Sequence, residues 1–172
     1  MTGLDIKEKV ERYINGIVDD NIIIDGIQEA INHLGIKGRV VDTIEVEAES
    51  GEVYDLPSDI IRVIKVEIKD ENKYYYNYMI DGLMIRFQEE GIYTIYAKKH
   101  PFVVGNINIE LELHPILENC VLDYVKGFAK LVFDDNSVDG LRLTEKFERD
   151  SLQAYNVLNS NKRGIGKVRV VR

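Results

Sequence analysis

The fold class is decided by residues 56–68, which read Leu56-Pro57-Ser58-Asp59-Ile60-Ile61-Arg62-Val63-Ile64-Lys65-Val66-Glu67-Ile68. Pro57 has no backbone N–H and cannot sit in a central strand, so the first four residues form a connector. After it, the apolar side chains at positions 64, 66 and 68 alternate with charged ones, which is the period of a half-buried strand. Residues 56–68 therefore predict a turn that leads into a long strand.

Similar strand patterns lie on both sides of this segment. Alternation of apolar residues with Glu marks residues 44–48, and residues 74–80 place Tyr and Ile at every second position. Asp81-Gly82 is a strong hairpin signal and is followed by two more apolar segments, 84–87 and 92–97. Because tight turns join these segments, we expect the strands to be antiparallel.

At both ends of the chain the apolar spacing changes to that of helices. Residues 4–18 and 24–34 carry two apolar stripes, and Gly35 stands where a glycine commonly ends a helix. A long stripe at 117–133 and another at 141–158 predict two further helices. The order along the chain is therefore two helices, a β region and two helices.

We predict an α+β fold in which the N- and C-terminal helices form a bundle, with an antiparallel β-meander domain inserted between them and a flexible C-terminal tail. The expected parts are the N-terminal helices (residues 1–38), the β domain (39–113), the C-terminal helical hairpin (114–160) and the basic tail (161–172).

Charge is distributed unevenly between the body and the tail. The chain has 172 residues and a formal net charge of −8, but residues 162–172 hold five Lys or Arg and no acid. Without these five positive charges, residues 1–161 carry −13. An acidic body repels nucleic acid. We expect no membrane span and no secretion signal, and the lone Cys120 excludes an internal disulfide and fits a reducing cytoplasm.

Residues that could support catalysis are scattered. His33, His100 and His114 show no metal-ligand spacing, and Cys120 is expected to be a buried, inert thiol. Gly-Ile-Gly at 164–166 lacks the strand and helix that frame a phosphate loop. Residues 134–140 lack the regular ligand spacing of a calcium loop and predict a capping turn between helices. We therefore expect no catalytic site, no metal site and no cofactor.

Two sets of residues are candidates for contact with other proteins. The first is a tyrosine cluster, interpreted either as cross-strand packing in the core or as an inter-subunit contact: Tyr74, Tyr75, Tyr76 and Tyr78. The second is the basic tail, either a solvated end or an arm that orders on a partner and adds a strand to its sheet. Its candidate binding residues are Lys162, Arg163, Lys167, Val168, Arg169, Val170, Val171 and Arg172.

The order of these motifs resembles the head–tail adaptor (connector) proteins of tailed bacteriophages, including the tail-tubular type. The resemblance covers residues 15–158. It rests on the strand entry at 56–63, the hairpin at 81–87, the strand Gly91-Ile92-Tyr93-Thr94-Ile95-Tyr96-Ala97 and the helix start at 112–115. Each motif is a turn or strand pattern, so their order is what carries weight.

The resemblance implies a structural virion protein of the neck, made in the host bacterial cytoplasm. Such adaptors form a ring, typically of twelve copies, beneath the portal protein. They extend the DNA channel without specific DNA binding, offer a platform to the next neck, stopper or tail protein, and carry no catalytic residues. Family members commonly dock a C-terminal element onto the portal, which here would be residues 162–172.

The sequence leaves one alternative of another class open, a non-viral module that binds a protein or peptide through its tyrosine-rich sheet. An enzyme is disfavoured, because no activated nucleophile, metal cluster or phosphate loop can be assembled from the residues above.

Overall fold

The computed structural model describes residues 1–69 and 73–159, so the expectations for the tail at 161–172 lie outside the described residues. Within these ranges the chain forms four helices and seven strands. The helices are α1 (Gly3–Ile14), α2 (Asp20–Ile36), α3 (Pro115–Phe133) and α4 (Val138–Asn159). The strands are β1 (Val41–Ala48), β2 (Val53–Asp55), β3 (Ile60–Ile68), β4 (Lys73–Tyr74), β5 (Tyr78–Asp81), β6 (Met84–Phe87) and β7 (Gly91–Lys99).

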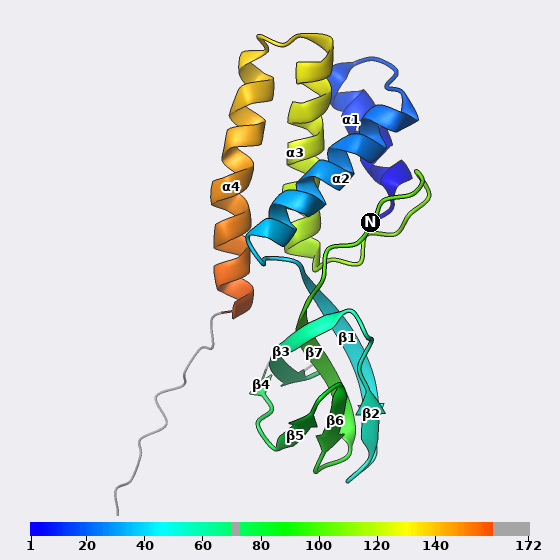
Figure 1. Ribbon diagram of the computed structural model, residues 1–172, viewed down its shortest axis with the longest axis vertical. Helices are drawn as coiled ribbons and strands as arrows, with labels where there is room; N and C mark the ends of the chain where they lie inside the picture. Colours follow the sequence, from blue (N-terminus) through cyan, green and yellow to red (C-terminus); the bar gives the residue numbers. More distant parts are fainter. Residues whose placement is uncertain (70–72, 160–172) are drawn as a thin grey trace, which may run out of the picture.

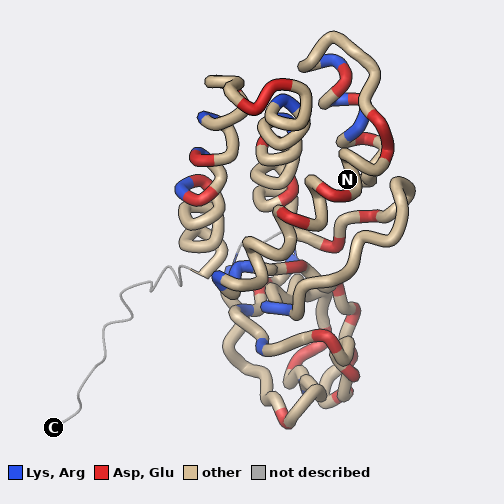
Figure 2. The backbone as a smooth tube through the Cα atoms, turned by 45° about the horizontal axis from the view of Figure 1, so that its top comes forward, with Lys and Arg blue, Asp and Glu red and all other residues tan. Residues whose placement is uncertain are grey.

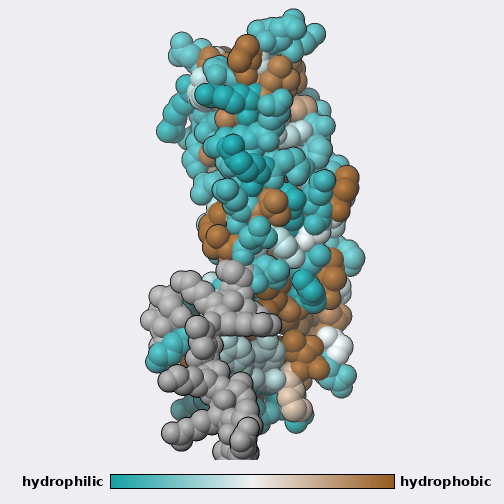
Figure 3. All heavy atoms as spheres, turned by 90° about the vertical axis from the view of Figure 1, so that its left-hand side faces the viewer, coloured by the Kyte–Doolittle hydropathy of each residue, from teal (hydrophilic) through white to brown (hydrophobic). Residues whose placement is uncertain are grey.

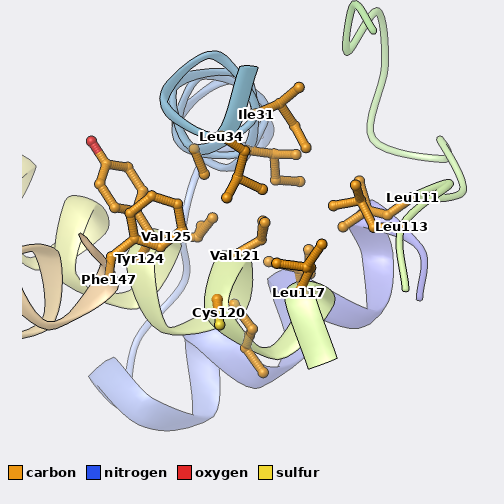
Figure 4. Close-up of a cluster of buried hydrophobic side chains, with 14 of the residues drawn as sticks. Ile31, Leu34, Leu111, Leu113, Leu117, Cys120, Val121, Tyr124, Val125 and Phe147 are labelled. Carbon is orange, nitrogen blue, oxygen red and sulfur yellow. The ribbon is translucent and has the colours of Figure 1, made fainter. Parts of the chain in front are cut away.

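The helices form one bundle, with α3 in contact with each of the other three. Its apolar stripe faces α2 and α4, so Val121 and Val125 lie beneath Ile31 and Leu34 of α2 (Figure 4). A Cβ atom on Gly127 of α3 would lie 2.8 Å from the Gly140 carbonyl oxygen of α4. A larger residue there would push the two helices apart, because a packed interior has no spare volume.

Local sequence signals explain where these helices begin and end. Thr2 caps α1 and forms a reciprocal capping box with Asp5. His114 caps α3, and Pro115 follows in its first turn as the sequence indicates. The glycine expected at the end of α2 is misplaced: Gly38, with a φ of 61°, follows the helix, while Gly35 lies within it. Gly35 instead permits close approach, since a Cβ there would lie 2.6 Å from Pro101 Cγ.

The strands form two antiparallel sheets, one with the order β1-β7-β3-β4 and one with the order β2-β6-β5. The α+β class, with an antiparallel β domain between two pairs of helices, is thus confirmed. The strand order nevertheless differs from a simple meander, because β1 pairs with β7, the most distant strand in sequence. The predicted strand 74–80 is also divided, with β4 in the first sheet and β5 in the second.

After β7 the chain returns to the helices instead of ending in another strand. Val104, Leu111 and Leu113 of this return segment are buried in the helical core, and Gln28 of α2 accepts a hydrogen bond from the Val104 amide at 2.8 Å. Residues 100–113, which the sequence analysis assigned to the β domain, therefore pack with the bundle.

The molecule is elongated, with the helical bundle at one end and the β module at the other (Figure 1). Each end has its own cluster of buried side chains, and β1 takes part in both: Val41 belongs to the helical core and Val46 to the β core. The two parts are therefore joined by continuous, hydrogen-bonded strands.

Candidate interaction surface

The small sheet β2-β6-β5 is built around the β5–β6 hairpin. Asp81 pairs with Met84, so the connecting loop is Gly82-Leu83. Gly82 has a φ of 60°, as the first loop position of a type II′ hairpin requires. The hairpin predicted from Asp81-Gly82 is therefore confirmed.

This hairpin exposes apolar side chains on its outer surface. The strand register places Val53, Arg86 and Met79 in one row, and Asp55, Met84 and Asp81 in the next. The opposite face holds Ile85 and Phe87, which are fully buried. Val53, Met79 and Met84 lie on the outer face, Leu83 lies in the loop, and Ile80, on the face of Ile85, is exposed because β5 ends the sheet. Together with Ile61 at the start of β3, these residues are 41–60% exposed, and we call the six the apolar face: Val53, Ile61, Met79, Ile80, Leu83 and Met84.

Two shallow hollows meet at Ile80 on the apolar face. One, of about 220 Å³, is lined by Val53, Met79 and Met84 together with Asp81 and Arg86. The other, of about 200 Å³, lies between the hairpin loop and the start of β3. Methionine adapts its shape to varied partners, and exposed apolar patches with polar rims mark protein interaction sites. The arrangement is thus chemically suited to holding another polypeptide.

The far end of the β module is acidic. Glu47, Glu49, Glu52 and Glu90 line a third hollow, of about 680 Å³, beside Tyr54. Lys and Arg lie instead where the bundle meets the β module and on the helices, where they are interspersed with Asp and Glu (Figure 2). In the space-filling view most of the bundle surface is hydrophilic, and hydrophobic residues appear near the top of the bundle, at the junction and on the β module (Figure 3).

The sequence matches no protein-family model and no curated protein. The resemblance to phage adaptors therefore rests on the order of motifs in this chain, and the surface has to be interpreted from its own chemistry.

The structure divides the four candidate tyrosines between core and surface. Tyr75 is buried against Tyr93, with ring centroids 4.6 Å apart, and its hydroxyl accepts hydrogen bonds from the Gln88 and Glu89 amides, both at 3.2 Å. Tyr78 is half-buried and stacks on Tyr75. Tyr76 is 72% exposed. Core packing thus accounts for Tyr75, and among these four tyrosines Tyr76 is the most exposed candidate for a contact.

The junction between the bundle and the β module is held by a buried lysine that the sequence analysis did not single out. The Lys99 ammonium lies 2.6 Å from Glu112, 3.0 Å from Asp59 and 3.3 Å from Asp42, and Lys99 is only 5% exposed. Burial lowers the pKa of Lys99, but hydrogen bonds to Glu112 and Asp59 outweigh it, and the net pKa is raised. Lys99 therefore stays charged and ties the ends of β1 and β7 to the return segment.

His114 and Cys120, which were considered for a metal site or catalysis, both make local hydrogen bonds at the start of α3. His114 Nδ1 accepts the Ile116 amide proton at 3.2 Å, and burial together with the Lys65 charge lowers the pKa of this histidine. Burial raises the pKa of the Cys120 thiol, which donates to the Ile116 carbonyl at 3.4 Å. At neutral pH His114 is therefore a neutral residue that caps α3, and the Cys120 thiol stays protonated.

The segment considered as a calcium loop connects two helices. Residues 134–137 form the turn between α3 and α4, and residues 138–140 begin α4, where the Ser137 hydroxyl accepts a hydrogen bond from the Gly140 amide at 3.2 Å. Across residues 1–69 and 73–159, no group of three or more His, Cys, Asp or Glu is placed to hold a metal ion. Over the same ranges, no helix is both long and apolar enough to cross a membrane.

The apolar face was not anticipated from the sequence, although a signal existed. Apolar residues occupy consecutive positions, 78–80 and 83–85, on both sides of Asp81-Gly82. In a strand pair with one buried face, consecutive apolar residues must place some side chains on the outside. A departure from strict alternation was therefore the available indication of this surface.

Proposed function

We propose that this chain is a structural head–tail adaptor of a tailed bacteriophage. In this proposal, copies of the chain form a ring beneath the portal protein, extend the DNA channel and present a platform to the next neck or tail component. The protein acts in the virion neck by fitting between other subunits and catalyses no reaction.

The observation that carries the proposal is the apolar face of the β module. Its six side chains leave apolar surface in water in the single chain, and burying such surface stabilises a complex by about 25 cal/mol per Å². A face with two shallow hollows and a charged rim suits a protein partner better than a small molecule, which binds in enclosed pockets.

The charge distribution supports passage of DNA without retention. The acidic hollow at the far end of the β module repels phosphates at short range, and the net charge of −8 acts in the same direction. The proposal predicts no mobility shift of duplex DNA by the purified protein at low salt, where electrostatic attachment would be strongest.

Electron microscopy of portal rings mixed with the purified chain tests the proposal directly. We expect added ring-shaped density on one end of the portal, typically with twelvefold symmetry. A chain that lacks residues 162–172 should stay folded and fail to assemble, since those residues are the proposed arm for a partner. Portal rings that gain no density from the full chain would refute the adaptor function.

A matched pair of substitutions tests whether the apolar face takes part. Met84→Lys places a charge on the face, and Leu152→Lys places one on α4 at the same exposure of 43%. We expect the first to reduce assembly and the second to leave it unchanged. If both variants assemble equally well, the apolar face takes no part in assembly.

The alternative function, a non-viral module that binds a peptide through its tyrosine-rich sheet, is favoured by the strong exposure of Tyr76. It predicts a monomeric complex with a peptide and no ring on any portal.

A further inference from the structure

Strand β5 forms one edge of the small sheet, because among the described residues it pairs only with β6. An edge strand presents a row of unpaired N–H and C=O groups to any extended segment. Its side chains are apolar at Tyr78, Met79 and Ile80 and acidic at Asp81, with Met79 and Asp81 on the outer face of the sheet and the other two on the opposite face. A matching strand therefore needs both apolar and basic residues.

The chain contains such a segment outside the described residues. Residues 168–172 read Val-Arg-Val-Val-Arg, so they are β-prone and carry two positive charges. Eight residues, 160–167, separate this segment from the end of α4. Fully extended, eight residues span about 26–29 Å, which is enough to reach an adjacent molecule.

We propose that residues 168–172 of one copy add a fourth strand to the small sheet of a neighbouring copy, antiparallel to β5. The inference rests on the proposed function, which brings copies side by side. In the matching register, Val171 lies beside Met79 and Val170 beside Ile80. The same register places Arg169 beside Asp81.

Charge and apolar complementarity select this register. Within the described residues, Asp81 forms no ion pair, and it gains one from Arg169. The fourth pair places Arg172 beside the Tyr78 ring, where a guanidinium is attracted to the aromatic face. Cross-strand pairs of these kinds are the units that stabilise a sheet.

A labelled peptide of residues 160–172, titrated into a chain truncated after Asn159, tests the contact without any portal. We expect saturable binding that Met79→Lys weakens at least tenfold. Phe133→Lys, on the bundle at a closely matched exposure (57% against 60% for Met79), should leave binding unchanged. A shuffled peptide of the same composition should bind at least tenfold more weakly.

The register is tested by a double-mutant cycle and by backbone methylation. Asp81→Asn keeps the size and shape of the side chain and removes the charge, and the Gly82-Leu83 loop is unchanged. It should weaken binding about twofold to fivefold, which is the range expected for one ion pair at a surface. Arg169→Gln in the peptide should add little further loss, whereas Arg172→Gln should add its full effect. N-methylation at Val170 and at Val171 should differ by at least tenfold, because alternate N–H groups face β5.

Complementation between two defective chains shows whether the contact is intermolecular. One chain lacks residues 162–172, and the other is full-length Met79→Lys. Each alone should be monomeric, while their mixture should form a one-to-one pair through the intact edge of the first and the tail of the second. Light scattering after size-exclusion chromatography measures the mass of each chain alone and of the mixture.

Four outcomes would overturn the inference: no peptide binding, equal binding of the shuffled peptide, peptide binding to portal rings but not to the truncated chain, and failure of the two defective chains to pair. None of these would affect the adaptor function, which the portal rings test separately.

Discussion

Replacing Lys99 with Met tests whether the junction between the bundle and the β module depends on one buried charge. Met has nearly the same length and retains the apolar contacts of the side-chain stem. The substitution leaves Asp42, Asp59 and Glu112 near one another without a cation. Their mutual repulsion and the lost hydrogen bonds both act against the folded state.

The expected loss follows from the exposure of the three carboxylates. Breaking a fully buried ion pair costs about 3–5 kcal/mol. The Asp59 and Glu112 side chains are 40% and 63% exposed, so water can solvate them after the change. We therefore expect a loss of about 2–3 kcal/mol, below the range for a fully buried pair. At about 2–4 °C per kcal/mol for a chain of this size, the melting temperature should fall by roughly 4–12 °C.

Urea unfolding followed by circular dichroism at 222 nm measures this loss, and Glu112→Gln is the control. Because Glu112 is largely exposed, its neutralisation alone should cost less than about 1 kcal/mol. The raised pKa of Lys99 adds a signature at high pH. Its contribution is complete below the ordinary lysine pKa of about 10.5 and is lost as pH rises through the higher folded-state value. The difference between wild type and Lys99→Met should therefore shrink above pH 10.5; a difference under about 0.5 kcal/mol at pH 7 would refute the reasoning.

Three further predictions concern single sites. Phe87→Ala removes a fully buried ring stacked on Tyr93 and should cost about 3–5 kcal/mol in urea unfolding, whereas a cost below about 1 kcal/mol would contradict the assigned core. Gly35→Ala forces its new methyl group against Pro101 and should cost about 1–3 kcal/mol, measured by the same titration; an unchanged midpoint would show that the return segment moves freely. His114→Asn keeps a capping acceptor but does not titrate. Because the pKa of His114 is lowered, wild type should lose stability relative to this variant as pH falls from 7.5 to 5, and parallel pH profiles would contradict the neutral cap.

The helices and most strand segments could be predicted because their signals are local. Helical spacing, the Pro115 helix start and the Asp81-Gly82 hairpin each involve neighbours in sequence, and the structure contains all of them. The pairing of β1 with β7 could not be predicted in this way. It joins residues about fifty positions apart, and the alternating pattern of each strand is equally compatible with several partners.

The candidate surface shows the same limit. The tyrosines attracted attention by their composition, but whether each lies inside or outside depends on the break between β4 and β5, which no residue pattern marked. Likewise, the three carboxylates around Lys99 come from β1, the connector before β3 and the return segment. Only the folded arrangement brings them together.

The continuity of β1 and β7 has a mechanical consequence. Both strands run from the junction at Val41 and Lys98 to the far end of the β module at Ala48 and Gly91, paired along their whole length. Backbone hydrogen bonds loaded in shear along two such strands resist extension, and the return segment between β7 and α3 is itself packed into the helical core. A force applied at the far end of the β module would therefore tilt the helical bundle as a rigid unit instead of stretching the connection between the two parts.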